Sequence, residues 1–346
     1  MRFMKLSYML SMLAGSALSL SGQSTFSGPA SGYVFDNVGH SVRAVLGVPG
    51  AAYLGSASQP AWDSVSVAPN GRWALGVTGL SLNWIPDLSR PASFFSLPQV
   101  SGPILRIAWS SDSTTAATWS PTTGHLQRIT GLDSAPAIHD PIDLTAVSGL
   151  LSGWSLSPDG RYLAFSSSAP GTSSVYFSDR DHAPVPIGSV ADPGAVAFSA
   201  DGASLFVFGG AARQILQLDV PSGAVAGSFD ASPFGVAGGV SVSGTRIRDL
   251  RRDRRPAEVQ DLAGSGDGAR LYAIGGQTLC GYDLSTSQPM SCRNLEVPPT
   301  SFQPMPGGIL LLNYRRAANM PYWLLDGKAG QLYFVPSGSA STNAAF

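Results

Sequence analysis

The sequence is poor in the residues that usually cover the surfaces of helices. It contains 20 Asp but only two Glu, and 19 Arg but only two Lys. Glu and Lys suit solvent-facing helix positions, whereas Asp suits turns, where its carboxylate accepts hydrogen bonds from backbone N–H groups. With 40 Gly and 26 Pro among 346 residues, the composition argues against a helical protein and predicts an all-β fold with many turns.

Cysteine is almost absent, because the chain has only Cys280 and Cys292. Two Cys exclude a fold held together by many disulfides. Both lie in predicted strands and are equidistant from position 286, in the turn at 285–288, so they could face each other across a hairpin. A bridge needs Cα atoms within about 7 Å. We expect one disulfide, and two unpaired thiols remain the alternative.

Long apolar runs are absent except near the N-terminus. Arg2 and Lys5 precede an apolar run at 6–20, and small residues follow it. This order is typical of a secretory signal peptide, and about 15 apolar residues are short for a membrane span, which needs about 20. We expect a signal peptide at 1–22, export to the periplasm or the cell exterior, and no membrane span.

A hairpin motif recurs along the rest of the chain. Its best copy is "SLSPDGRYLAFSSS" at 155–168, in which a Pro-Asp-Gly turn separates two alternating strands. Such a turn lets the chain adopt positive φ between antiparallel strands. Aligned on the turn residue, the copies stand at positions 71, 113, 160, 202, 268 and 308.

A second short strand pair follows the turns, so one unit holds four strands in about 40 residues. In this pair one strand ends in or near an Asp, and these residues are Asp36, Asp179, Asp219, Asp283 and Asp326. Recurrence at one place in the unit indicates a structural role in the next turn. Units of this size with four strands predict the blades of a β-propeller, which stack around a ring to bury their faces.

The repeat resembles the WD40-like repeat of bacterial exported propellers of the TolB-like and YVTN-like type. The resemblance covers about residues 60–336 and implies the fold while saying little about function. The pair at 33–48 matches only the last two strands of a unit. We therefore expect seven four-stranded blades with one incomplete, and six blades plus an extra hairpin remain the alternative. One propeller domain would span 23–346.

A basic insertion interrupts the repeat at about 231–258. It contains Arg246, Arg248, Arg251, Arg252, Arg254 and Arg255. These residues could form an anion-binding patch, or a solvated loop in which Asp249 and Asp253 partly neutralise the Arg side chains. Aromatic stacking partners are missing nearby, and export argues against a nucleic-acid partner.

No motif for catalysis or metal binding is present. The four His (His40, His125, His139 and His182) are scattered without metal-ligand spacing, and the chain has no Gly-x-Ser-x-Gly motif. We predict no catalytic residue, no metal and no cofactor. The sequence favours a monomeric, non-catalytic binding or scaffold module for a protein or glycan partner. The alternative is a lactonase- or lyase-like enzyme with its site in the central channel.

Overall fold

The computed structural model describes residues 30–337, apart from 49, 59, 101–102, 105, 145–146, 148, 170–171, 180–181, 221, 235–258, 314–316 and 319. Among the described residues, no helix is long and apolar enough to cross a membrane.

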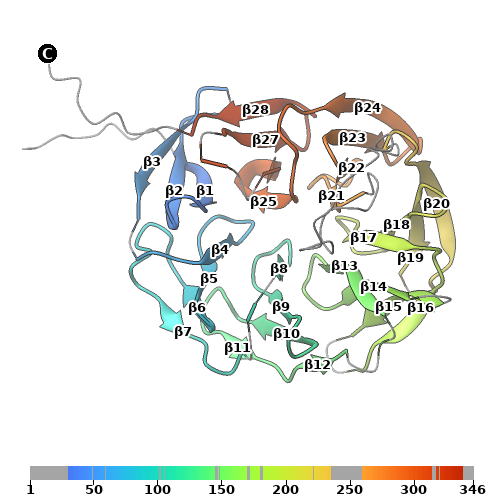
Figure 1. Cartoon of the computed structure of the whole chain (residues 1–346), viewed down its shortest axis with the longest axis horizontal. Coiled ribbons are helices and arrows are strands. Elements are labelled where there is room, and N and C mark those ends of the chain that lie inside the picture. The colour runs from blue at the N-terminus through green and yellow to red at the C-terminus, as the bar shows by residue number, and fades with distance from the viewer. Residues whose placement is uncertain are drawn as a thin grey trace, which may run out of the picture.

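The described strands form seven antiparallel sheets arranged around a central channel, so the chain folds as a seven-bladed β-propeller (Figure 1). Blade 1 is formed by β1 (Ala30–Asp36), β2 (Ser41–Leu46) and β3 (Tyr53–Ala57), and blade 2 by β4 (Ser64–Val67), β5 (Ala74–Thr78), β6 (Ser81–Ile85) and β7 (Phe95–Ser96). Blade 3 is formed by β8 (Arg106–Trp109), β9 (Ala116–Ser120), β10 (His125–Thr130), β11 (Ala137–Ile138) and β12 (Ile142–Asp143). Blade 4 is formed by β13 (Leu150–Leu156), β14 (Leu163–Ala169), β15 (Thr172–Ser178) and β16 (Val185–Gly188). Blade 5 is formed by β17 (Pro193–Phe198), β18 (Ser204–Gly209), β19 (Gln214–Asp219) and β20 (Val225–Asp230). Blade 6 is formed by β21 (Asp261–Gly264), β22 (Arg270–Gly275), β23 (Thr278–Asp283) and β24 (Gln288–Asn294). Blade 7 is formed by β25 (Gln303–Met305), the 3₁₀ helix η1 (Pro306–Gly308), β26 (Ile309–Leu311), β27 (Tyr322–Asp326) and β28 (Leu332–Val335).

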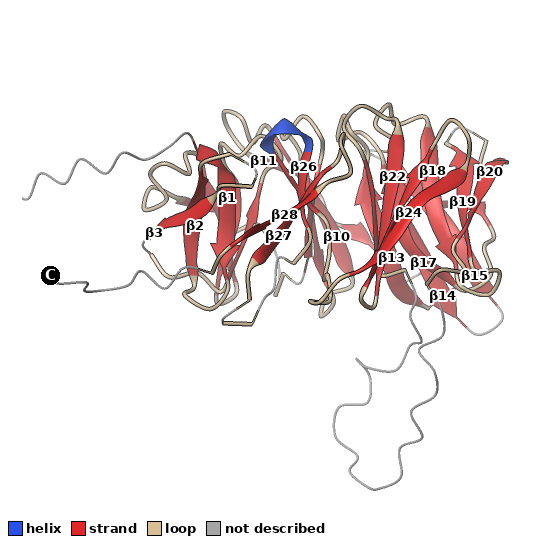
Figure 2. Ribbon diagram, turned by 90° about the horizontal axis from the view of Figure 1, so that it is seen from above, coloured by secondary structure: helices blue, strands red, loops and turns tan. Residues whose placement is uncertain are grey.

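In blades 2 to 7 the chain starts at the channel and moves outward, one hairpin at a time. Because consecutive strands are antiparallel, the first strands of these blades all run in one direction. Their first residues therefore lie at one mouth of the channel. In Figure 2, which turns the ring by 90°, turns and loops lie along the two faces.

The Pro-Asp-Gly turn of the best repeat is held by a serine at its start. The Ser157 Oγ donates to the Asp159 Oδ1 at 2.5 Å and accepts the Tyr162 N–H at 2.8 Å. The Asp159 carboxylate also accepts the Arg161 N–H at 3.0 Å, and Gly160 has a φ of 68°. The same serine–aspartate bond recurs in three further blades, in the pairs Ser110–Asp112, Ser199–Asp201 and Ser265–Asp267.

Blade 1 is the incomplete blade. It has three strands, and its innermost strand β1 packs against β4 and η1. The structure corrects the expectation that the pair at 33–48 holds the last two positions of a unit. These strands hold the second and third positions, and β3 supplies the outer one. A strand at the channel position of blade 1 is absent from the described residues.

The inner strands of blades 7 and 2 meet where blade 1 lacks an inner strand. The Gln303 Nε2 donates to the Val67 carbonyl at 3.5 Å, and the turn at Gly71 approaches Pro306. A Cβ placed on Gly71 would lie only 2.7 Å from the Pro306 Cγ, so this position needs glycine for space as well as for its φ of 68°. The channel is thus bounded by six inner strands, whereas the ring has seven sheets.

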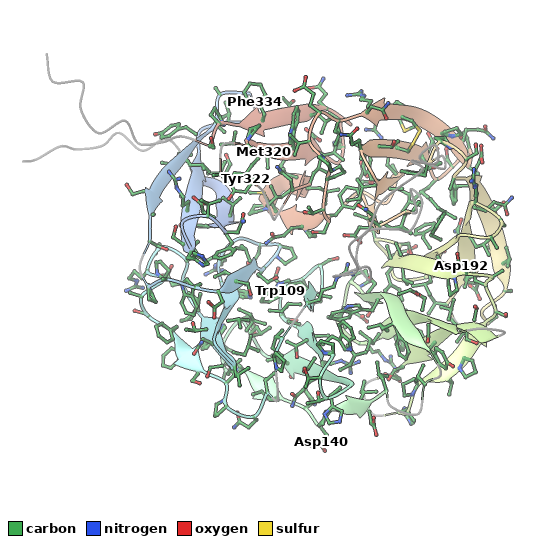
Figure 3. All side chains as sticks on the ribbon, viewed as in Figure 1. Trp109, Asp140, Asp192, Met320, Tyr322 and Phe334 are labelled. Atoms are coloured by element: carbon green, nitrogen blue, oxygen red, sulfur yellow. A yellow bond between two sulfur atoms is a disulfide. The ribbon has the colours of Figure 1, made fainter. Side chains whose placement is uncertain are left out.

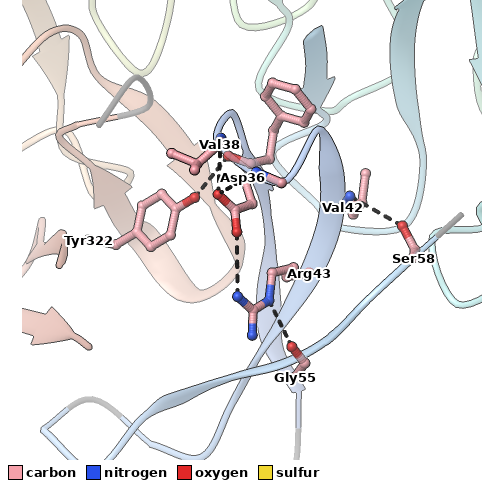
Figure 4. A network of polar contacts seen from close by, with 9 residues as sticks. Asp36, Val38, Val42, Arg43, Gly55, Ser58 and Tyr322 are labelled. Carbon is pink, nitrogen blue, oxygen red and sulfur yellow. Dashed lines mark hydrogen bonds and ion pairs between the residues drawn. The ribbon is translucent and has the colours of Figure 1, made fainter. Parts of the chain in front are cut away.

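Side-chain packing between neighbouring blades forms the core. Blades 7 and 1 close the ring through one such cluster, in which Tyr322 and Leu324 pack with Val34 and Val45. The Tyr322 hydroxyl also donates to the Phe35 carbonyl at 2.9 Å. Beside it, the carboxylate of Asp36 accepts the N–H of Val38 and forms an ion pair with the guanidinium of Arg43 in β2, as Figure 4 shows.

Candidate binding cavity in the channel

The channel contains a cavity of about 570 Å³. Its lining comes mainly from the first strands of blades 2, 3, 4 and 6 and from the segment that enters β25. Small-molecule sites usually have volumes of about 300–1,000 Å³. Figure 3 places Trp109, one of the lining residues, at the inner edge of the ring.

Among the described residues, two charged side chains line the cavity, and they form an ion pair with each other. The Arg106 Nη2 lies 3.4 Å from the Asp261 Oδ1, although 155 residues separate them. The Asp261 carboxylate also accepts the backbone N–H groups of Leu262 at 3.0 Å and Phe302 at 2.8 Å. Burial raises the pKa of this carboxyl, against the opposing effect of the guanidinium and the two N–H donors.

Arg106 is only partly used by this contact. Its side chain is 41% exposed, and its single hydrogen bond to a described residue is the one to Asp261. A guanidinium carries five N–H donors, so most of the Arg106 donors remain available in the cavity.

Aromatic side chains line much of the remaining wall. These are Trp109, Trp119, Trp154 and Phe302. The Trp109 Nε1 donates to the Ser66 Oγ at 2.9 Å, which fixes the orientation of the indole. Trp154 is buried, whereas the other three rings are half-buried and present part of their surface to the channel.

Four hydroxyl groups add to the polar lining, which also includes Ser66, Ser152, Gln260 and Gln303. Ser64, Ser155, Thr300 and Ser301 border the cavity. Their side-chain oxygens make no hydrogen bond to another described residue. A hydroxyl both donates and accepts, so these groups can bind a ligand that offers either kind of partner.

Sequence reasoning missed the ion pair, although the repeat contained the signal. Arg106 and Asp261 each stand seven residues before the turn position of their copies, 113 and 268. The other copies carry Ser64, Gly153, Ala195 or Ser301 at that position. Two opposite charges at one repeat position, each at the start of an inner strand, indicate that both side chains lie at equivalent places beside the channel.

The two cysteines face each other across the outer hairpin of blade 6. Cys280 in β23 pairs directly with Cys292 in β24, and the structure joins them in a disulfide with the Cα atoms 4.1 Å apart. This bridge lies on the outer edge of the ring and takes no part in the cavity.

The predicted arginine patch lies outside the described residues, because positions 246–255 fall within 235–258. The predicted leader at 1–22 also lies outside them. Both stay predictions.

The repeated Asp residues bind their own turns. Asp219, Asp283 and Asp326 accept backbone N–H groups two or three positions further on, and Asp36 does the same in blade 1. Asp179 forms an ion pair with Arg161 at 3.4 Å. None of these five lines the cavity.

The described lining has few titratable side chains. Among the described residues that border the cavity there is no His, Cys, Glu or Lys. The described part of the chain also has no group of three or more His, Cys, Asp or Glu side chains that could hold a metal ion. This arrangement is suited to binding through stacking and hydrogen bonds.

Trp84 in β6 is half-buried. It packs against Phe95 with ring centroids 5.7 Å apart. It lies in blade 2, outside the cavity.

No protein-family model matches the chain, and no curated protein shows significant similarity to it. The β-propeller fold therefore stands on the structure itself.

Proposed function

We propose that the protein is an exported β-propeller that acts as a non-catalytic binding or scaffold module for a protein or glycan partner. The observation that carries the proposal is the composition of the channel cavity. Aromatic faces, free hydroxyls and one charge-neutral ion pair surround about 570 Å³ of space. Concave sites with mainly apolar walls and a few convergent polar groups are typical binding sites.

The second candidate is a lactonase- or lyase-like enzyme acting in the same channel. Such chemistry would need several acidic, His or Arg side chains converging at one mouth. The described lining has one Asp and one Arg, which are paired with each other. A general acid or base works best when its pKa lies near the operating pH, and the His that usually supplies one is missing from the lining.

Export rests on the N-terminal sequence pattern, and the likeness to TolB-like and YVTN-like propellers rests on the repeat motif. We propose that the mature protein begins near residue 23 and works outside the cytoplasm as a monomer. Expression of the full chain with a C-terminal tag, followed by fractionation and N-terminal sequencing, tests this. Full-length protein retained in the cytoplasm would contradict it.

The function is tested by filling the cavity. Ser155 is a half-buried lining residue, so Ser155→Trp (the plug variant) should occupy the channel. Thr122→Trp is the matched control, because Thr122 is exposed in the turn between β9 and β10 and does not line the cavity. Both variants are compared with the wild type for binding to cell-surface polysaccharide and to envelope protein fractions.

We expect the plug variant to lose binding and the control variant to retain it. In parallel, all three proteins are assayed with lactones and with uronate-containing polymers in the presence of Ca²⁺, Mg²⁺ or Zn²⁺. Turnover by the wild type that the plug variant abolishes would replace the binding function by the enzymatic one. Circular dichroism and thermal melting establish that both variants are folded.

A further inference from the structure

The polar groups of the cavity define the chemistry of its ligand. We propose that the channel binds a neutral, polyhydroxylated ligand, a saccharide unit of a glycan, between its aromatic faces and its free hydroxyls. This inference rests on the proposed function, since it names the ligand class of the same cavity.

The charge of the cavity argues for a neutral ligand. The guanidinium of Arg106 and the carboxylate of Asp261 lie 3.4 Å apart and neutralise each other, and no other charged side chain lines the cavity among the described residues. An anionic ligand that reached Arg106 would also approach the carboxylate of Asp261. Like charges at such distances repel each other, and more strongly where water is partly excluded.

The unused hydrogen-bonding groups argue for a ligand rich in hydroxyls. The cavity offers the remaining N–H donors of Arg106 together with the hydroxyls of Ser64, Ser155, Thr300 and Ser301. These groups include both donors and acceptors. A polyol presents the same two functions at each hydroxyl, so it can satisfy the set without bringing a net charge.

The aromatic walls argue for a ring with an apolar face. Trp109, Trp119 and Phe302 are half-buried around the cavity, and the hydrogen bond to Ser66 holds Trp109 in place. The C–H face of a sugar ring stacked on such a surface is removed from water, which is favourable. A wall that is fixed before binding also lowers the entropic cost of association.

The size of the space favours a small unit over a folded segment. The cavity holds about 570 Å³, a volume within the range of small-molecule sites. Six inner strands bound the channel that contains it. We therefore place the end or a short stretch of a glycan here, and treat a peptide segment as an outcome of the test.

The test uses neutral and acidic sugars of the same stereochemistry. Glucose is compared with glucuronate, and galactose with galacturonate, by ligand-detected saturation-transfer NMR, which reports weak binding. Titration calorimetry with the corresponding short oligosaccharides then gives affinities. At least one neutral sugar should bind, and its acidic counterpart should bind about tenfold more weakly or not at all.

Variants locate the binding in the cavity. Thr300→Val and Ser155→Ala each remove one lining hydroxyl, and a lost hydrogen bond should weaken binding about 2- to 10-fold. Thr122→Val removes an exposed hydroxyl outside the cavity and should leave the affinity unchanged. Val is close in shape to Thr, so both Thr variants should fold alike.

Three outcomes overturn the inference. They are acidic sugars that bind as tightly as the neutral ones, sugar binding that the plug variant Ser155→Trp retains, and the absence of binding to any sugar tested. If no sugar binds but a peptide from an envelope protein binds and the plug variant loses it, the ligand class is wrong and the proposed function survives. Turnover in the channel would overturn the proposed function itself.

Discussion

Replacing Ser157 by Ala tests whether the repeated serine is required for the blade. Ser157 is 1% exposed. Its hydroxyl donates to the Asp159 carboxylate and accepts the Tyr162 N–H. The substitution removes both hydrogen bonds and leaves the N–H of Tyr162 without this partner.

The expected loss of stability follows from these two bonds. A hydrogen bond to a charged group contributes about 1.5–3 kcal/mol, and a neutral one about 0.5–1.5 kcal/mol. Because Asp159 is exposed and water can replace the serine at its carboxylate, the lower ends of these ranges apply. We expect Ser157→Ala to lower the free energy of unfolding by about 2 kcal/mol.

Ser285→Ala is the matched control. The Ser285 Oγ donates to the Asp283 Oδ1 at 2.6 Å, so the bond has the same chemistry, but Ser285 is exposed. Water can replace both partners there, and surface substitutions of this kind usually change stability by less than about 0.5 kcal/mol. Urea unfolding followed by tryptophan fluorescence and circular dichroism measures both variants. Equal losses in the two variants would refute the reasoning, because burial would then have no effect.

Three further predictions follow from other parts of the ring. Gly71→Ala should lower the free energy of unfolding by about 1–3 kcal/mol, because the position has a positive φ and an added Cβ would meet Pro306. Gly79→Ala is the control, because Gly79 has a similar φ but lies in open space, and it should lower the free energy of unfolding by less in the same urea assay. Equal losses in the two variants would show that the contact with Pro306 is unimportant. Reduction of the unfolded protein should make Cys280 and Cys292 available to two alkylating groups by mass spectrometry, and alkylation of both without reduction would exclude the disulfide. Because burial raises the folded pKa of Asp261 above its ordinary value of 3.8, the folded state binds this proton more tightly than the unfolded state. Wild-type stability should therefore fall relative to Asp261→Asn as pH rises through that window, measured by urea unfolding at each pH. A wild-type stability that rises relative to Asp261→Asn with rising pH would refute the assignment.

Much of the fold was predictable because it repeats. The Pro-Asp-Gly turns specify hairpins locally, and their spacing of about 40 residues indicates four strands per blade. Seven blades with one incomplete is what the structure shows. Blade 1 was placed in the wrong positions because its Asp36 resembles the Asp that precedes the outer turn in other blades, and the short strand at Tyr53–Ala57 carries no turn motif.

The cavity was not predicted because its residues come from different blades. Arg106 and Asp261 are separated by 155 residues, and neither belongs to a local motif. Their contact depends on the curvature of the ring, which brings the starts of β8 and β21 together. The sequence indicates that both occupy the same position in their repeats, but the distance between two blades follows only from their number and packing.

The way blade 1 closes the ring has a mechanical consequence. Within the described residues the first and last blades share no strand, and they are joined by side-chain packing and by the Tyr322 hydrogen bond. Force applied between Ala30 and Val335 would therefore load these contacts between sheets, together with the ladder ends at Ala30–Leu46 and Tyr322–Val335. Such contacts can separate one at a time, so we expect this junction to yield at low force while the other six interfaces remain intact.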